Sequence, residues 1–405
     1  MMDEESKELL QRIKENDDNL TKLFIGNDTE YGYEESFIFN SSKGSDFTKL
    51  GQYIATNTYL EKLQIDIQSL ANVNIRKGFY DGLRSNSTIQ TLMLRCNYAL
   101  LGDVGNEILR AYHVNSRHLT HLYILRANLQ QNEAEHIALT LRSCTNLTHI
   151  NLCVGNINDH KLASIVDALR GQSSLERLYL NRNSIGNDGC EALATLLSHP
   201  NCNLQEIQLS NNNIGNEGAI TIGNSLANNT TLKKIFLNDN AVDHSVAGIF
   251  CNLLCNTTSI DSIYSSNHTL CGLHFGRLHD SVGHLSQLLI INGKTNKRHV
   301  VMKKILKYNK LDMQPLYDWD SEDEYSLKAL PFVINWLENA RVAVKLPQTR
   351  EEMRMAGGHR EEDPGRRYNI DERKLSAIYQ FARDMPLMFV DQRVLRRSKR
   401  KRVGS

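Results

Sequence analysis

Apolar residues recur along this chain in a phrase that repeats every 28 to 30 residues. In the clearest copies, between Leu175 and Val242, a leucine is followed by apolar residues at offsets +3 and +5. Alternate apolar positions over so short a run predict a β-strand with one buried face. The same offsets place the starts of eight such strands at Leu60, Ile89, Leu119, Leu147, Leu175, Leu204, Leu232 and Ile260.

A second apolar set follows each strand at helical spacing, at offsets +15, +18, +19 and +22. In the unit that starts at Leu175, this set is Cys190, Leu193, Ala194 and Leu197. A strand followed by a helix at a fixed period indicates a solenoid, in which each unit packs on its neighbours. The predicted fold class is therefore α/β: a horseshoe with a concave parallel β-sheet, convex α-helices and a helical C-terminal extension.

The repeated phrase resembles a known class of repeat. L-x-x-L-x-L-x-x-N-x-I followed by IGNDG (residues 185–189) or IGNEG (residues 214–218) resembles the ribonuclease-inhibitor-like class of leucine-rich repeats. The resemblance covers about residues 60–285 and matches no specific protein. It implies a binding surface, because the class includes inhibitors, innate-immune sensors, actin-capping proteins and GTPase activators of the Ran type.

Asparagine recurs at two places in the units. A ladder of buried asparagines at offset +8 is expected to bond backbone groups of adjacent turns. Its predicted members are Asn97, Asn183, Asn212 and Asn240, with Ala127, Gly155 and His268 as interruptions. Sequons such as those at Asn86 and Asn229 stand just before a strand and are interpreted as turns, not as glycan sites.

The pattern changes at both ends of the solenoid. Leu285, Leu288 and Ile290 suggest one more strand, and residues 300–306 a closing helix. Five of the six prolines lie beyond this point. The predicted organisation begins with an N-terminal cap that contains a degenerate repeat at 1–59 and a solenoid of about eight or nine repeats at 60–311. A helical cap at 312–345, a flexible linker at 346–370, a helix at 371–392 and a basic tail at 393–405 follow.

Composition indicates a soluble, folded protein with 40% hydrophobic and 23% charged residues. The acidic, polar start is unlike a signal peptide, and no run of about 18 apolar residues predicts a membrane span. Eight scattered cysteines without a secretion signal favour free thiols in a reducing compartment. We therefore expect a cytoplasmic monomer, or a nuclear one if the basic tail is an import signal.

Exposed strand positions form the predicted binding site. The concave face carries the residues at offsets +2, +4 and +6, which the core does not require. Aromatic residues are favoured anchors at interfaces, although aromatics on a sheet can also simply pair across strands. The expected partner-binding residues are Tyr123, Tyr179, Phe236 and Tyr264 at +4, with His121, His149, Arg177 and Lys234 at +2.

Metal and catalytic chemistry are not expected. Cys251 and Cys255 with Cys271 and His274 have zinc-like spacing. However, Cys251 occupies the small +19 position of the helix, so packing explains it. No phosphate-binding glycine loop, nucleophile elbow or zinc-protease helix is present in the sequence. We predict no metal, no cofactor and no enzymatic activity.

Charge is distributed unevenly along the chain. Residues 341–405 carry 17 Lys and Arg against 9 Asp and Glu, a net +8, so the remainder sums to −7 for the total of +1. The tail concentrates this charge at Arg396, Arg397, Lys399, Arg400, Lys401 and Arg402. Such a cluster suits nuclear import factors, nucleic acid or anionic lipid, although a solvated chain end can also be basic.

The sequence thus favours a non-enzymatic scaffold or adaptor that binds a partner protein on the concave face. Two alternatives stay open. One is a nuclear factor whose basic tail supplies nucleic-acid affinity, and the other is an accessory protein for small-GTPase activation.

Overall fold

A computed structural model describes residues 2–26, 37–75, 77–113, 117–258, 260–275, 283–294 and 297–308. The chain divides into two compact units. Unit 1 comprises Met1–Leu254 and Asn267–Thr295, and unit 2 comprises Cys255–Ser266 and Asn296–Ser405. The predicted segments 312–345, 346–370, 371–392 and 393–405 lie outside the described residues.

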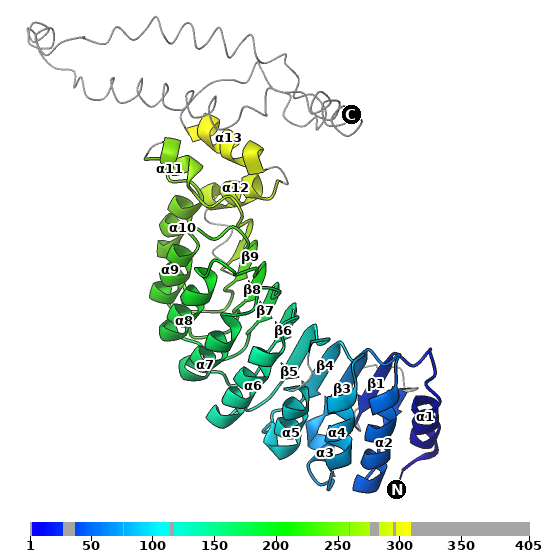
Figure 1. Ribbon diagram of the computed structural model, residues 1–405. Coiled ribbons are helices and arrows are strands. Elements are labelled where there is room, and N and C mark those ends of the chain that lie inside the picture. Colours follow the sequence, from blue (N-terminus) through cyan, green and yellow to red (C-terminus); the bar gives the residue numbers. More distant parts are fainter. Residues whose placement is uncertain are drawn as a thin grey trace, which may run out of the picture. The chain divides into compact units, whose positions relative to one another are not determined.

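Unit 1 contains a parallel β-sheet of ten strands in the order β10-β9-β8-β7-β6-β5-β4-β3-β1-β2 (Figure 1). From β3 onward, neighbours in the sheet are also neighbours in sequence, as expected for a solenoid. The strands are β1 Lys22–Ile25, β2 Ile38–Phe39, β3 Lys62–Asp66, β4 Thr91–Arg95, β5 His121–Leu125, β6 His149–Asn151, β7 Arg177–Tyr179, β8 Glu206–Gln208, β9 Lys234–Phe236 and β10 Gly272–His274.

Helices follow the strands and lie on one side of the sheet, so its other face is left uncovered by them (Figure 1). In unit 1 the helices are α1 Glu4–Lys14, α2 Gly44–Thr56, α3 Ile67–Leu70, α4 Lys77–Ser85, α5 Gly102–Tyr112, α6 Gln131–Ser143, α7 Asp159–Leu169, α8 Asn187–Leu197, α9 Asn216–Ser225, the 3₁₀ turn His244–Val246, α10 Ala247–Leu254 and α12 Gly283–Asn292. The described part of unit 2 contains α11 Ile260–Tyr264 and α13 Lys297–Tyr308, which pack together.

The predicted α/β repeat fold is confirmed. The first seven predicted starts each lead into a strand, β3 to β9. In the unit of Leu175, the residues at offsets 0, +3 and +5 are at most 3% exposed, and Cys190, Leu193 and Leu197 of α8 are equally buried. The apolar residues of strand and helix therefore share one core between the sheet and the helical layer.

The eighth start, at Ile260, is wrong. Residues Ile260–Tyr264 form α11, and the next strand of the sheet is β10, which pairs with β9. The true phrase begins at Leu270, where Leu270 and Leu273 are buried at offsets 0 and +3. An insertion before Leu270 lengthens the spacing from Leu232, so counting a constant period places the strand too early.

The end of unit 1 also differs from expectation. Leu285, Leu288 and Ile290 belong to α12 rather than to a strand. Leu285 and Leu288 are buried while Ile290 is 67% exposed, as a helix with one covered face requires. The predicted closing helix at 300–306 is confirmed, since it lies within α13.

The asparagine ladder at offset +8 is confirmed at three positions. The Asn183 amide donates to the carbonyls of Leu152 and Leu180 at 3.0 and 2.9 Å, and its oxygen accepts from two amides of the preceding unit. Asn212 and Asn240 repeat this pattern in the next units. Each side chain thus connects two turns.

Asn97 is not part of that ladder. It is exposed, has a φ of 46°, and donates to the Gln68 side chain at 3.0 Å. In five other units the left-handed residue stands at offset +7, at Arg126, Val154, Arg182, Asn211 and Asp239. In this unit the left-handed pair is Asn97 and Tyr98, so the turn comes one residue later and the asparagine points outward.

A second asparagine series lies three residues before the strand starts. Asn86 and Asn229 each accept from the backbone amide that opens the strand and donate to carbonyls of the preceding unit. Their exposures are 1% and 8%. Because a glycan cannot be attached to a buried amide, the interpretation of these sequons as structural turns is confirmed.

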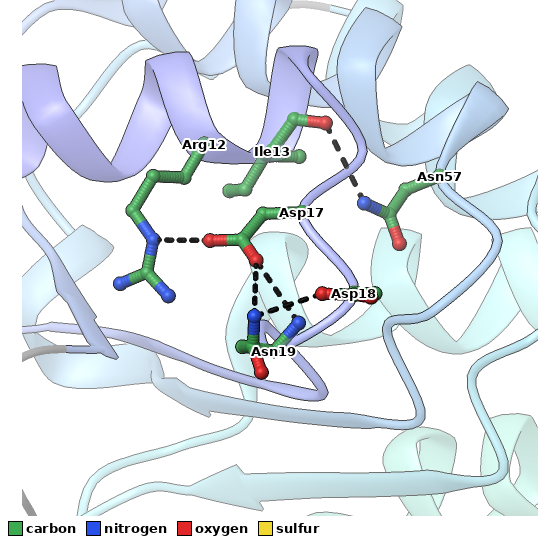
Figure 2. A network of polar contacts seen from close by, with 6 residues as sticks. All are labelled: Arg12, Ile13, Asp17, Asp18, Asn19 and Asn57. Atoms are coloured by element: carbon green, nitrogen blue, oxygen red, sulfur yellow. Dashed lines mark hydrogen bonds and ion pairs between the residues drawn. The ribbon is translucent and has the colours of Figure 1, made fainter.

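An asparagine three residues before a strand start also joins the first repeat to the N-terminal segment (Figure 2). Asn57 donates to the Ile13 carbonyl at 3.5 Å, so α1 receives the bond that a preceding repeat would otherwise take. Next to it, Arg12 Nε donates to Asp17 at 2.7 Å, and Asp17 accepts from the Asn19 amide at 2.9 Å. These bonds, with the Arg12 guanidinium first, hold the pKa of Asp17 below its usual range. The turn after α1 is thereby set against the first repeat.

Candidate protein-interaction face

Two rows of side chains cross the uncovered face of the sheet. Paired residues on adjacent strands stand next to each other at about 4.8 Å. The first row is Lys62, Thr91, His121, His149, Arg177, Glu206, Lys234 and Gly272. The second row is Gln64, Met93, Tyr123, Asn151, Tyr179, Gln208, Phe236 and His274.

Seven of the eight predicted site residues lie in these rows. Tyr264 does not, because it belongs to α11 and not to a strand. Its predicted place in the second row is taken by His274, whose ring stacks on Phe236 with centroids 4.4 Å apart and planes at 8°. The prediction for Tyr264 is wrong for the same reason as the strand start at Ile260.

The aromatic residues of the second row are half-buried. Tyr123, Tyr179 and Phe236 all keep part of their rings accessible. Burial raises the pKa of Tyr123 and of Tyr179, and the nearby Glu206 carboxylate contributes at Tyr179. Their hydroxyls therefore stay protonated and can donate hydrogen bonds to a ligand.

His121, His149 and Arg177 make one contact chain in the first row. The two imidazoles stack, with centroids 4.3 Å apart and planes at 14°. Arg177 Nη1 lies 2.8 Å from His149 Nε2. These three side chains come from β5, β6 and β7, 28 residues apart in sequence, and only the sheet brings them together.

Hydrogen bonds to threonines show which nitrogen carries the proton in His121 and in His149. Thr148 Oγ1 donates to the Thr120 carbonyl at 3.1 Å and lies 2.8 Å from His149 Nδ1, so Nδ1–H is the donor to that hydroxyl. Thr120 stands in the same relation to His121 and the Gln90 carbonyl. Since a guanidinium can only donate, His149 Nε2 must accept from Arg177, and the ring is neutral.

Burial and the charges near the two rings also favour the neutral state of His121 and His149. The pKa of His121 is lowered by burial first, and then by Arg177 and Lys62. The pKa of His149 is lowered by burial, His121 and Arg177, while Glu176 and Glu206 oppose the shift. Both histidines are therefore uncharged at neutral pH.

The comparison with known families rests on two units of this sheet. A family profile described as a leucine rich repeat matches residues 171–194 and 201–223. These segments contain β7 with the start of α8, and β8 with most of α9. These two units are leucine-rich repeats. No protein of curated function matches the sequence of this chain.

The solved structures that resemble this chain share little sequence with it and superpose on it with low TM-scores. The leiomodin-1 actin-binding site 2 is 16% identical, covering 43% of this chain and 92% of that chain with a TM-score of 0.32. A protein from Bacteroides fragilis is 11% identical, covering 60% and 69% with a TM-score of 0.34. An internalin from Listeria monocytogenes is 16% identical, covering 70% and 92% with a TM-score of 0.31. Likenesses this weak carry no argument about partners or activity.

Sequence reasoning missed His274 as a member of the repeat face. A signal for it exists, because Asn267 and Thr269 precede Leu270 just as Asn229 and Thr231 precede Leu232. Asn267 indeed accepts from the Leu270 amide at 2.9 Å and is 3% exposed. At this unit the asparagine three residues before the strand marks the repeat start that a constant period misses.

His274 and three cysteines share a zinc-like spacing in the sequence. Over the described part of the chain, no three His, Cys, Asp or Glu side chains gather closely enough to hold a metal ion. No helix in that same part is both long and apolar enough to cross a bilayer.

Proposed function

We propose that this leucine-rich repeat protein binds a partner protein on the first and second rows. The observation that carries the proposal is the second row, where Tyr123, Tyr179 and Phe236 stand on the face that the described helices leave uncovered. The fold does not need these rings, because Leu178 and Ile235 on the same strands point to the other face and are fully buried.

The three rings are suited to act as anchors. A half-buried ring on a strand has already lost much of its conformational freedom, so little further entropy is lost on binding. Aromatic side chains at the centre of an interface commonly account for a large share of its binding energy. Polar neighbours Asn151 and Gln208 separate the rings and can hydrogen-bond the backbone of a bound chain.

A double substitution, Tyr179→Ala with Phe236→Ala, tests this proposal. Partners are first captured from a cell extract with the full chain, and the affinity of a purified partner is then measured by calorimetry. We expect the affinity to fall by about tenfold to a hundredfold, since a buried aromatic anchor contributes at least 1 kcal/mol. The melting temperature should stay close to that of the unmodified protein because both side chains lie outside the core.

Tyr264→Ala is the matched control. Tyr264 is an accessible aromatic residue, 43% exposed, but it lies on α11 and not in the rows. We expect this substitution to leave the affinity unchanged. If the double variant captures the same partners with the same affinity as the control, the proposed binding face is wrong.

A further inference from the structure

We propose that the segment bound by this face is acidic, that its carboxylates contact His149 and Arg177, and that its binding adds protons to His121 and His149. This inference rests on the proposed function and specifies the chemistry of the partner. It concerns the part of the first row between β3 and β7.

Charge complementarity supports an acidic occupant. From β3 to β7 the first row carries Lys62, His121, His149 and Arg177, with Thr91 as the only residue that has no basic group. Neither described row contains a carboxylate over these five strands. The three strands β5 to β7 span about 10 Å, which is about three residues of an extended chain. A segment with alternate or adjacent carboxylates would fit this length.

The contact between Arg177 and His149 makes the surface responsive to protons. Arg177 Nη1 donates to His149 Nε2 only while that nitrogen is unprotonated. After protonation both groups are donors, so the contact is replaced by repulsion across a 2.8 Å separation. A carboxylate placed between them accepts from both and removes this repulsion.

His121, the ring that stacks on His149, is affected by the protonation of His149. His121 lies against His149 with centroids 4.3 Å apart, and both Nδ1 atoms already donate to threonine hydroxyls. The Nε2 atoms are thus where a proton would be added. In the free protein, nearby cations oppose the positive charge of a protonated ring. Lys62 and Arg177 do so at His121, and His121 and Arg177 do so at His149.

The sign of the pH effect follows from these surroundings. In the free protein both histidines are neutral at pH 7, because burial and the nearby cations lower their pKa values. Glu176 and Glu206 act in the opposite direction at His149. A bound carboxylate raises both pKa values, so binding takes up protons and strengthens as the pH falls from the pKa values of the bound state toward the lower ones of the free state.

A peptide fits this surface better than a nucleic acid does. Glu206 stands directly beside Arg177 in the first row, and Glu176 precedes it in the sequence. A nucleic acid gains affinity from many contacts between basic side chains and its phosphates. The basic part of the first row is short, because it ends at Glu206. The adjacent Tyr123 and Tyr179 hydroxyls can also donate to a short peptide bound across the strands.

Random nonapeptides displayed on phage and selected at pH 6.0 against the full chain provide the first test. The same library is selected against an Arg177→Gln/His149→Gln variant. We expect Asp and Glu to be enriched at least threefold among peptides bound to the unmodified protein, and this enrichment to disappear with the variant. Comparison with the variant removes peptides that bind the basic segment 393–405, which both proteins share.

Fluorescence anisotropy with a selected acidic peptide provides the second test. We expect the dissociation constant to fall at least fivefold between pH 8.0 and pH 6.0, since each proton taken up changes affinity by up to tenfold per pH unit. In His121→Gln/His149→Gln the ratio should fall below twofold. His160→Gln is the matched control on α7, where His160 is exposed, and it should keep the full pH dependence.

The outcomes separate the two proposals. Peptides that need the rows but are not acidic, or acidic peptides whose affinity ignores pH, overturn this inference and leave the proposed function standing. A single-stranded oligonucleotide that competes through Arg177 and His149 also overturns it, because the ligand is then a polyanion. If no peptide depends on the rows and Tyr179→Ala/Phe236→Ala also has no effect, both proposals are wrong.

Discussion

Asn212 shows at the scale of one residue how neighbouring units are joined. Its amide donates to the carbonyls of Leu180 and Leu209 at 3.0 and 2.9 Å, and its oxygen accepts from the Ile185 amide at 3.1 Å. The side chain is 7% exposed. Removal would leave the buried Ile185 amide without this acceptor and would take one of two asparagine donors from each carbonyl, since Leu180 also accepts from Asn183 and Leu209 from Asn240.

We therefore expect Asn212→Ala to lower the free energy of unfolding by about 2–4 kcal/mol, because three buried hydrogen bonds disappear at once. Asn97→Ala is the control, since Asn97 has the same repeat offset but is exposed and bonds only to the Gln68 side chain. Its effect should be below about 0.5 kcal/mol. Urea denaturation followed by circular dichroism measures both, and equal effects would contradict the assigned ladder.

At the scale of elements, the spacing between helices depends on small residues. Gly82 on α4 faces Gly51 on α2, and a Cβ added to Gly82 would lie 2.0 Å from the Gly51 carbonyl oxygen. A Cβ added to Gly51 would lie 2.5 Å from the Gly78 carbonyl oxygen. Backbone atoms cannot rotate away as a flexible side chain can, so the two helices can approach this closely only with glycine at the contact.

Gly82→Ala should lower the free energy of unfolding by about 2–4 kcal/mol, because the two helices must separate to admit the methyl group. Gly248→Ala is the matched control within α10, where an added Cβ meets no atom within 4 Å. That change should raise stability by up to about 1 kcal/mol, since alanine favours the helix. We expect the melting temperature to fall for Gly82→Ala and to rise for Gly248→Ala. A change in the same direction in both variants would contradict the close approach of α2 and α4.

At the scale of the whole molecule, the chain combines a neutral-to-acidic body with a basic end. The net charge is +8 over residues 341–405 and −7 over the rest, which sum to the total of +1. The two rows and the basic tail thus lie in different parts of the sequence. An affinity for nucleic acid through the tail is the alternative function, and it can be measured separately from the rows.

Deletion of residues 393–405 tests that alternative. If the tail binds nucleic acid, the full chain should be retained on a single-stranded oligonucleotide, with log affinity falling by about 0.7 per phosphate contact for each log unit of salt. The deletion should abolish retention, whereas Tyr179→Ala/Phe236→Ala should not change it. Equal retention of the full and shortened chains would exclude this role of the tail.

The repeat period carries most of the information about the fold. Leu175, Leu178 and Leu180 alternate because neighbouring residues on a strand point to opposite faces, and this information is local. The same local alternation is enough to place Tyr179 and Phe236 on the open face. The error at Ile260 arises where an insertion changes the period, and the error at Asn97 arises where the turn moves by one residue, since periodicity contains neither length changes nor backbone conformation.

The sequence by itself therefore determined the class of repeat, seven of the eight predicted strand starts and the place of seven of the eight predicted residues in the two rows. The tertiary structure decided the rest: His274 replaces Tyr264 in the second row, Asn57 connects the first repeat to α1, and Arg177 donates to His149. The physical reason is distance along the chain. A strand's buried face depends on its own residues, whereas a contact between side chains 28 or more positions apart depends on the register that the whole sheet sets.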